Sequence, residues 1–176
     1  MVKNLKNLAL SEVIDIKQIE AVNQPIERAH GLPNQCYTSQ EYMTIEIEKV
    51  FKDKWTVIGT GSSVPNTGDA IPYNLLGIPL IILRDKESRV RVFHNVCSHR
   101  GFKLLDKACS LKNILRCPYH SWAYDFEGKL VATPHIGGLN VHTSDKFDKT
   151  KSNLKEVRTK IWMDIIFVNI NNNEIE

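Results

Sequence analysis

The sequence lacks any apolar run long enough to cross a membrane. Its longest apolar runs, residues 80–83 and 165–168, have the length of strands, whereas a membrane helix needs about 18 residues. The N-terminus, MVKNLKNLALSEVIDIK, has no sustained apolar stretch before its acidic residues, so it does not resemble a secretory signal. We therefore expect no membrane segment and a cytoplasmic location.

A strong charge of one sign is also missing. The 176 residues include 23 basic and 20 acidic side chains, and the formal net charge of +3 is too small to indicate nucleic-acid binding. Internal repeats and low-complexity segments are missing as well. Because 42% of the residues are hydrophobic, the chain is expected to fold around a core, and its length suits one compact domain with an appendage.

Cysteine is scarce, with Cys36, Cys97, Cys109 and Cys117 only. Four cysteines are enough for two disulfides, but Cys97 and Cys117 stand near histidines, and the expected compartment keeps thiols reduced. We therefore expect no disulfide framework, and we interpret Cys36 and Cys109 as inert thiols.

The pattern of the chain changes near Trp55. Before it, residues 11–22 have helical spacing and Pro25 closes them, and a second helix is predicted over residues 39–52, with Thr38 and Glu41 as a capping box. After it, short β-type runs alternate with turn signals, which predicts an antiparallel β-sandwich or small barrel. The predicted strands lie within residues 55–60, 69–76, 78–84, 89–95, 113–117, 121–126, 129–132, 153–161 and 163–170.

Two short segments combine a thiol with an imidazole. They are CSHRG at residues 97–101 and CPYHSW at residues 117–122, and each has a residue able to tighten a loop, Gly101 in one and Pro118 in the other. Loops of this kind can aim two side chains at a common point. Together they offer four candidate metal ligands: Cys97, His99, Cys117 and His120.

A Cys₂His₂ donor set fits two kinds of metal centre. One is a tetrahedral zinc site, and the other is a Rieske [2Fe–2S] cluster, in which two histidines replace two cysteines on one iron. Structural zinc sites often group like ligands in pairs, whereas each segment here supplies one of each kind. In a two-iron cluster this mixing lets both cysteines converge on one iron and both histidines on the other, so the cluster is favoured.

The pattern C-x-H-x₁₇-C-x₂-H resembles the Rieske domain of Rieske non-heme iron oxygenases. The resemblance extends over about residues 37–170 and includes FHNVCSHRG, the Trp-x-Tyr-Asp-x-x-Gly segment and the closing WMDIIFVNI. CPYHSW is most similar to α subunits of the choline, glycine betaine and ring-hydroxylating kind. The resemblance implies a mainly β, Rieske-type antiparallel β-sandwich at residues 37–176 after a helical arm at residues 1–36. We expect the catalytic mononuclear-iron domain of the family to be absent from these 176 residues.

The resemblance also implies roles for the four ligands. Cys97 and Cys117 would bind one iron, and His99 and His120 the other, so this chain would carry cofactor ligands and no catalytic residue. In the family the cluster takes one electron from a ferredoxin or flavin reductase and passes it to the mononuclear iron of a catalytic domain. The second cluster histidine, here His120, faces a carboxylate of a neighbouring subunit, which suggests a homotrimer for the full-length protein.

Other positions bear on whether the chain has a second iron site and on how it differs from respiratory Rieske proteins. The remaining histidines, His30, His94, His135 and His142, form no closely spaced pair with a nearby acid, so a second iron site is not expected. Respiratory Rieske proteins have a disulfide at the positions of Phe102 and Tyr119 and a serine at Trp122. The sequence therefore predicts a reduction potential at the low end of the Rieske range. Trp122 either shields the cluster or packs in the core.

The charges around the two segments suggest a partner. Residues 97–129 carry a net charge of +3, and the rest of the chain sums to zero. Either a basic collar steers an acidic ferredoxin toward the cluster, or these charges form an ordinary solvated face.

Three functions are compatible with the sequence. They are the electron-transfer domain of a Rieske oxygenase, a free-standing Rieske ferredoxin, and a zinc-stabilised binding module. The helical arm favours the first, because a minimal carrier needs only the β domain.

Overall fold

The structure is a computed structural model and describes residues 9–171. The chain divides into two compact units with a boundary between Trp55 and Thr56. The predicted arm of residues 1–36 falls in the first unit, although its first eight residues lie outside the described part. None of the described helices is long and apolar enough to span a membrane.

The first unit is helical. Its elements are a 3₁₀ turn (Leu10–Glu12), α1 (Ile16–Val22), α2 (Gln35–Thr38), and α3 (Gln40–Glu46), which continues as a π-helical turn over Ile47–Phe51. The predicted helix of residues 39–52 is thus confirmed.

The cap of α3 differs from the prediction by one residue. Ser39, not Thr38, accepts a hydrogen bond from the Tyr42 N–H, at 3.1 Å, and it donates its hydroxyl to Glu41. Thr38 ends α2 and donates its own hydroxyl to the Asn34 carbonyl, so it is not available as a cap.

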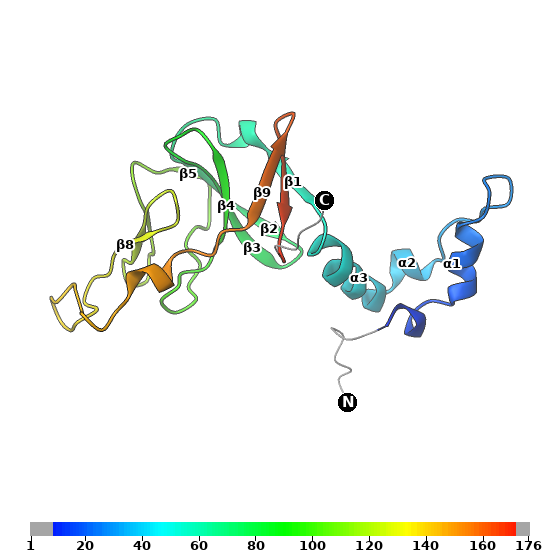
Figure 1. Cartoon of the computed structure of the whole chain (residues 1–176), viewed down its shortest axis with the longest axis horizontal. Helices are drawn as coiled ribbons and strands as arrows, with labels where there is room; N and C mark the ends of the chain where they lie inside the picture. Colours follow the sequence, from blue (N-terminus) through cyan, green and yellow to red (C-terminus); the bar gives the residue numbers. More distant parts are fainter. Residues whose placement is uncertain (1–8, 172–176) are drawn as a thin grey trace. The chain divides into compact units, whose positions relative to one another are not determined.

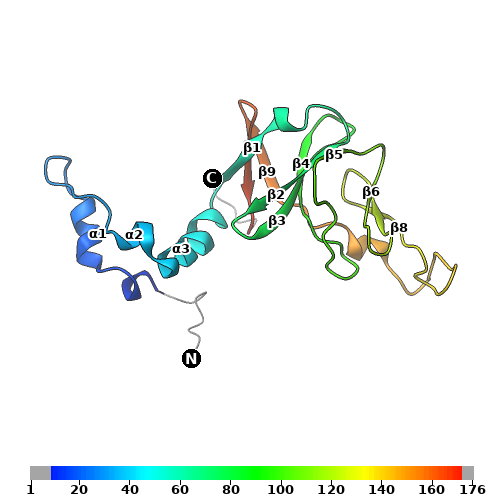
Figure 2. The same cartoon turned by 180° about the vertical axis from the view of Figure 1, so that it is seen from behind.

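The second unit is built from antiparallel strands in three sheets (Figures 1 and 2). The first sheet has the order β1 (Thr56–Thr60), β10 (Ile165–Asn169), β9 (Arg158–Trp162). The second has the order β4 (Val90–His94), β3 (Ile78–Arg84), β2 (Asp69–Leu75), β5 (Cys109–Ser110). The third has the order β6 (Leu115–Arg116), β7 (Ala123–Tyr124), β8 (Leu130–Ala132). The predicted antiparallel β class is confirmed.

Strand β3 separates two hydrophobic clusters. Successive side chains of a strand point to opposite faces, so Leu80 and Ile82 join one cluster with Ile166, whereas Ile81 and Leu83 join the other. The apolar run in the sequence therefore corresponds to a strand that is buried on both faces. The cluster that contains Ile81 and Leu83 also contains Cys97 and Cys117, so both cysteine segments lie against the core.

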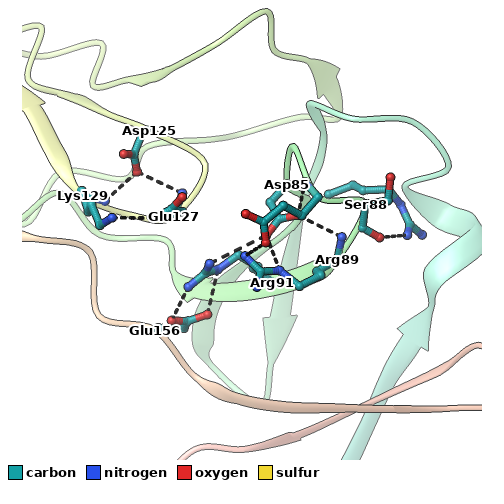
Figure 3. A network of polar contacts seen from close by, with 10 residues as sticks. Asp85, Ser88, Arg89, Arg91, Asp125, Glu127, Lys129 and Glu156 are labelled. Atoms are coloured by element: carbon teal, nitrogen blue, oxygen red, sulfur yellow. Dashed lines mark hydrogen bonds and ion pairs between the residues drawn. The ribbon is translucent and has the colours of Figure 1, made fainter.

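Two hairpin turns of the same geometry lie side by side, one between β3 and β4 and the other between β7 and β8 (Figure 3). In one, Asp85 Oδ1 accepts the N–H groups two and four residues later, and in the other Asp125 Oδ1 does the same, all at 2.9 Å. Burial opposes the ionisation of Asp85, but hydrogen bonds from Arg89 and the next residues outweigh it and lower the pKa of this carboxyl. Arg91 then joins β4 to Glu156 through two hydrogen bonds of 2.9 and 2.8 Å.

The segment before β9 holds the first cysteine segment in place. The Asn153 carbonyl accepts a hydrogen bond from the Ser98 hydroxyl at 3.0 Å, and the Asn153 side chain accepts the N–H of Leu130 at 2.9 Å. The Leu154 N–H donates to the Gly128 carbonyl at 2.8 Å. This one segment thereby joins residues 97–101 to the third sheet.

Candidate metal centre

The two cysteine segments fold into loops with the same backbone. We define loop 1 as residues 97–102 and loop 2 as residues 117–122. In each loop the N–H of the first residue donates to the carbonyl of the sixth, at 2.8 Å in loop 1 and 2.7 Å in loop 2. The N–H of the fifth residue donates back to the carbonyl of the first, at 2.9 and 3.0 Å respectively. Each loop is thus closed at its base and presents its histidine from the tip.

The fifth residue of each loop has a left-handed backbone. Gly101 has φ 68° and Ser121 has φ 59°. The sequence offers Pro118 as a residue able to tighten loop 2, and in the structure the positive φ of this loop belongs to Ser121. The reason is steric, because the ring of proline fixes φ near −65° and cannot supply a positive φ. Arg116 supports this turn by donating to the Ser121 carbonyl at 3.2 Å.

The loops separate the two kinds of donor by depth. Cys97 and Cys117 are 1% and 2% exposed, and both are free thiols within the hydrophobic core. His99 and His120 are only partly buried. The sulfur atoms therefore face the interior while the imidazoles lie closer to solvent, which is the division that a two-iron centre with unlike ligands requires.

The surroundings of Cys97 act on its protonation in opposite directions. Burial raises the pKa of this thiol, as does the nearby Cys117, while hydrogen bonds from the Tyr124 hydroxyl and the His99 backbone favour the thiolate. Tyr124 Oη lies 3.2 Å from Cys97 Sγ and accepts the Ser98 N–H at 3.1 Å. Because burial and the contact with Cys97 raise the pKa of Tyr124, its hydroxyl keeps its proton and donates it to the sulfur. Burial is the largest effect and the pKa of Cys97 is raised overall, so a thiolate at this depth needs a cation beside it.

The imidazoles are held by ring contacts. The centroids of the His99 and His120 rings are 4.8 Å apart with planes at 71°. Trp122, 3% exposed, stacks on His99 at 4.5 Å and 11°, and Phe147 packs on Trp122 at 5.4 Å. Trp122 therefore both packs in the core and covers one imidazole. Burial, His120 and Arg100 lower the pKa of His99, which favours the neutral form of the ring that a metal binds.

A hollow of about 550 Å³ opens beside the two imidazoles. Its lining includes both histidines, Arg100, Trp122 and the exposed loop residue His135. The His135 Nδ1 accepts the N–H of Asn140 at 2.8 Å, so this nitrogen serves the loop and is not directed at the centre.

These residues fit a [2Fe–2S] cluster better than a single ion. A two-iron cluster takes only two protein ligands per iron, because inorganic sulfides complete the coordination. Two buried thiols beside each other and two adjacent outer imidazoles match that requirement.

The fold and the site together define a class, the small β domains that hold an iron–sulfur cluster between two Cys/His loops. The family model of the Rieske [2Fe-2S] domain matches residues 54–143, about half of the chain. The chain therefore belongs to the Rieske [2Fe-2S] domain family, and the cluster predicted from the sequence is confirmed as its cofactor.

Its relatives are oxygenase subunits. The chain is 31% identical over 145 residues to the carnitine monooxygenase oxygenase subunit of Acinetobacter pittii, a match covering 82% of this chain and 38% of the relative. It is 30% identical over 154 residues to the biphenyl dioxygenase subunit alpha of Metapseudomonas furukawaii, which covers 85% and 34%. The chain thus spans little more than a third of the length of these relatives and corresponds to their N-terminal Rieske part.

Solved structures agree with the sequence matches. A quaternary ammonium Rieske monooxygenase in complex with L-carnitine superposes with a TM-score of 0.74 at 30% identity, over 84% of this chain and 40% of that one. Naphthalene 1,2-dioxygenase has a TM-score of 0.69 at 24% identity and shows the fold alone.

Some residues that shape the site were not found from the sequence. Tyr124 was noted only within a motif, and its bond to a thiol 27 residues away is a tertiary contact. Ser121 carries no signal for a positive φ. Phe147 and Asn153 reach the loops from distant segments, and no local pattern marks them.

Proposed function

We propose that the chain carries single electrons through a [2Fe–2S] cluster held by its two loops. The thiolates of Cys97 and Cys117 would hold the inner iron, and His99 and His120 the outer iron. The bound cluster supplies a carrier that gains and loses one electron. The observation that supports these ligands most strongly is the division of buried thiols from partly buried imidazoles on two loops of equal backbone geometry.

The chain's own residues prepare this site for electron transfer. Tyr124 donates to the Cys97 sulfur, which favours extra negative charge there. Trp122 covers one side of His99 and keeps water from it. His120 lies in the wall of the open hollow, where a partner can come close enough to exchange an electron.

We further propose that the chain serves as the N-terminal electron-transfer domain of a Rieske-type oxygenase, hydroxylating or demethylating. A ferredoxin or flavin reductase would supply the electrons, and a mononuclear iron in a catalytic domain would receive them. The solved structure of a similar protein, a quaternary ammonium Rieske monooxygenase, gave insights into inter-subunit electron transfer in that protein. By analogy the full-length protein would form a homotrimer, and its location would be cytoplasmic.

A free-standing Rieske ferredoxin is the second candidate. The helical unit before Thr56 argues against it, because a carrier needs only the β unit. Sequencing the gene beyond the codon for Glu176 separates the two. A reading frame that continues into a domain with two histidines and a carboxylate supports the oxygenase, and a stop codon there supports the carrier.

Charge near the imidazoles favours an acidic electron donor. Arg100 lines the hollow, and Arg116 holds loop 2 while its side chain stays exposed. Two other basic side chains of the segment, Lys103 and Lys129, form ion pairs with neighbouring acids, which reduces their contribution. We expect the rate of reduction by an acidic ferredoxin to fall as salt is added and to fall again in Arg100→Gln. A reduction rate that changes neither with added salt nor in Arg100→Gln would contradict docking by charge.

The direct test of the proposed cluster is anaerobic reconstitution of the chain with iron and sulfide. Two irons and two sulfides per chain, with visible absorbance that dithionite bleaches, are expected. A chain that takes up only zinc at full occupancy would disprove the redox role.

A further inference from the structure

Six aromatic rings form a continuous series across the two loops. From the exposed side, Phe102 contacts Tyr119 at 5.3 Å and Tyr119 contacts His120 at 3.7 Å between ring centroids. The series continues through the contacts already described, from His120 to His99, Trp122 and Phe147. Three of its five contacts cross from one loop to the other or back, so the rings join the loops as well as line them.

The two rings at the outer end of this series are both exposed to solvent. Phe102 is 43% exposed and Tyr119 is 54% exposed, although both are large aromatic side chains. The inner end needs no special account, because Trp122 is buried in the core cluster. Phe102 and Tyr119 pack on each other, and Tyr119 also packs on His120, a candidate iron ligand. Because neither ring is buried in the core, their role is other than core packing.

The positions of the two rings in their loops indicate that role. Phe102 closes loop 1, since its carbonyl accepts the Cys97 N–H at 2.8 Å. Tyr119 directly precedes His120 at the tip of loop 2. Contact between the rings therefore connects the base of one loop to the histidine of the other, on the side where the core gives no support.

We infer that Phe102 and Tyr119 are positioning residues that clamp loop 1 to loop 2 and fix the ring of His120. On the inner side Trp122 stacks on His99 and fixes its ring. On the outer side Tyr119, held by Phe102, packs on His120 and fixes that ring. The inference rests on the proposed function, in which His120 holds the outer iron. Neither residue binds the iron, and each acts through the orientation of the imidazole beside it.

The test measures how firmly the reconstituted chain keeps its cluster. An aromatic pair contributes enough that Phe102→Ala and Tyr119→Ala should each speed the loss of visible absorbance to an iron chelator about 2- to 12-fold. The double variant should be no faster than the more affected single variant, because both remove the same contact. Phe102→Tyr and Tyr119→Phe, which keep the rings, should retain the original rate. Trp162→Ala removes an exposed aromatic ring from β9 and is the matched control.

A spectroscopic readout separates positioning from general stability. Pulsed EPR of the reduced cluster reports the coupling to the histidine nitrogens, and Tyr119→Ala should broaden the coupling from His120 while Tyr119→Phe leaves it sharp. A disulfide in oxidised Phe102→Cys/Tyr119→Cys replaces the clamp covalently, so it should restore slow cluster loss, and its reduction should abolish the effect.

Three results would overturn the inference. They are alanine variants that behave like Trp162→Ala, single effects that add fully in the double variant, and effects confined to the rate of reduction by a donor protein, which would make the pair a docking patch. If the unaltered chain itself fails to bind the cluster, the proposed function fails instead, before any variant is compared.

Discussion

Replacing Tyr124 by phenylalanine removes its hydrogen bond to the buried Cys97 sulfur and the bond that its oxygen accepts from the Ser98 N–H. The hydroxyl lies 3.2 Å from Cys97 Sγ, and its oxygen already accepts the Ser98 N–H, so its proton is directed at the sulfur. The ring is fully buried within the core cluster, and phenylalanine keeps its packing. The change therefore removes the hydroxyl donor to the sulfur without opening a cavity in the core.

The size of the effect follows from the charge of the acceptor. A hydrogen bond to a charged group contributes about 1.5–3 kcal/mol, and we assign roughly 1 kcal/mol of it to the additional negative charge of the reduced state. For a one-electron couple about 1.4 kcal/mol corresponds to 59 mV, so Tyr124→Phe should lower the reduction potential by about 40 mV. The sign is negative because the lost donor favours the more negative, reduced form.

Protein-film voltammetry of the reconstituted chain measures this shift. Tyr73→Phe is the control, since Tyr73 packs against the other hydrophobic cluster and should leave the potential where it was. A potential that stays unchanged or rises in Tyr124→Phe would show that the hydroxyl does not donate to the ligand sulfur.

The remaining predictions concern the loops and the core. Gly101→Ala places a side chain at φ 68° where nothing else obstructs it, so urea unfolding should show a loss of about 1 kcal/mol. Ser121→Gly at φ 59° relieves the same strain and should be neutral or slightly stabilising in that assay. Asp85→Asn should cost about 1.5–3 kcal/mol at pH 7. Because the pKa of Asp85 is lowered in the folded state, its contribution is present above about pH 4 and is lost as pH falls below that. Equal stabilities of Asp85→Asn and the unaltered chain at pH 7 would contradict the network in Figure 3.

The sequence predicted those parts of the fold that depend on local pattern. The apolar run in β3 and the turn residues after it specify a strand and a hairpin within a few residues of each other, and the structure has both. Strand β5 was not predicted, because Cys109 and Ser110 form a strand by pairing with β2 and no local sequence pattern indicates this pairing. The cap of α3 was misplaced by one residue because threonine and serine stand side by side and either can cap a helix.

In the candidate site, too, the features that depend on local sequence were predicted and those that depend on tertiary contacts were not. The spacing of Cys97, His99, Cys117 and His120 indicated four ligands, because closely spaced donors are a local signal. The depth of the thiols, the hydroxyl of Tyr124 and the ring contacts depend on chain segments brought together by folding. Spacing alone therefore predicted the kind of centre but not what surrounds and tunes it.

The central claim is that His99 and His120 hold one iron and the two cysteines hold the other. Pulsed EPR of the reduced, reconstituted chain tests it most directly, by counting the nitrogen ligands in the unaltered protein and in single His→Ala variants. The account predicts two coupled nitrogens, with His99→Ala and His120→Ala each losing the Rieske spectrum of the unaltered chain. A spectrum that keeps both nitrogen couplings after either substitution would contradict it.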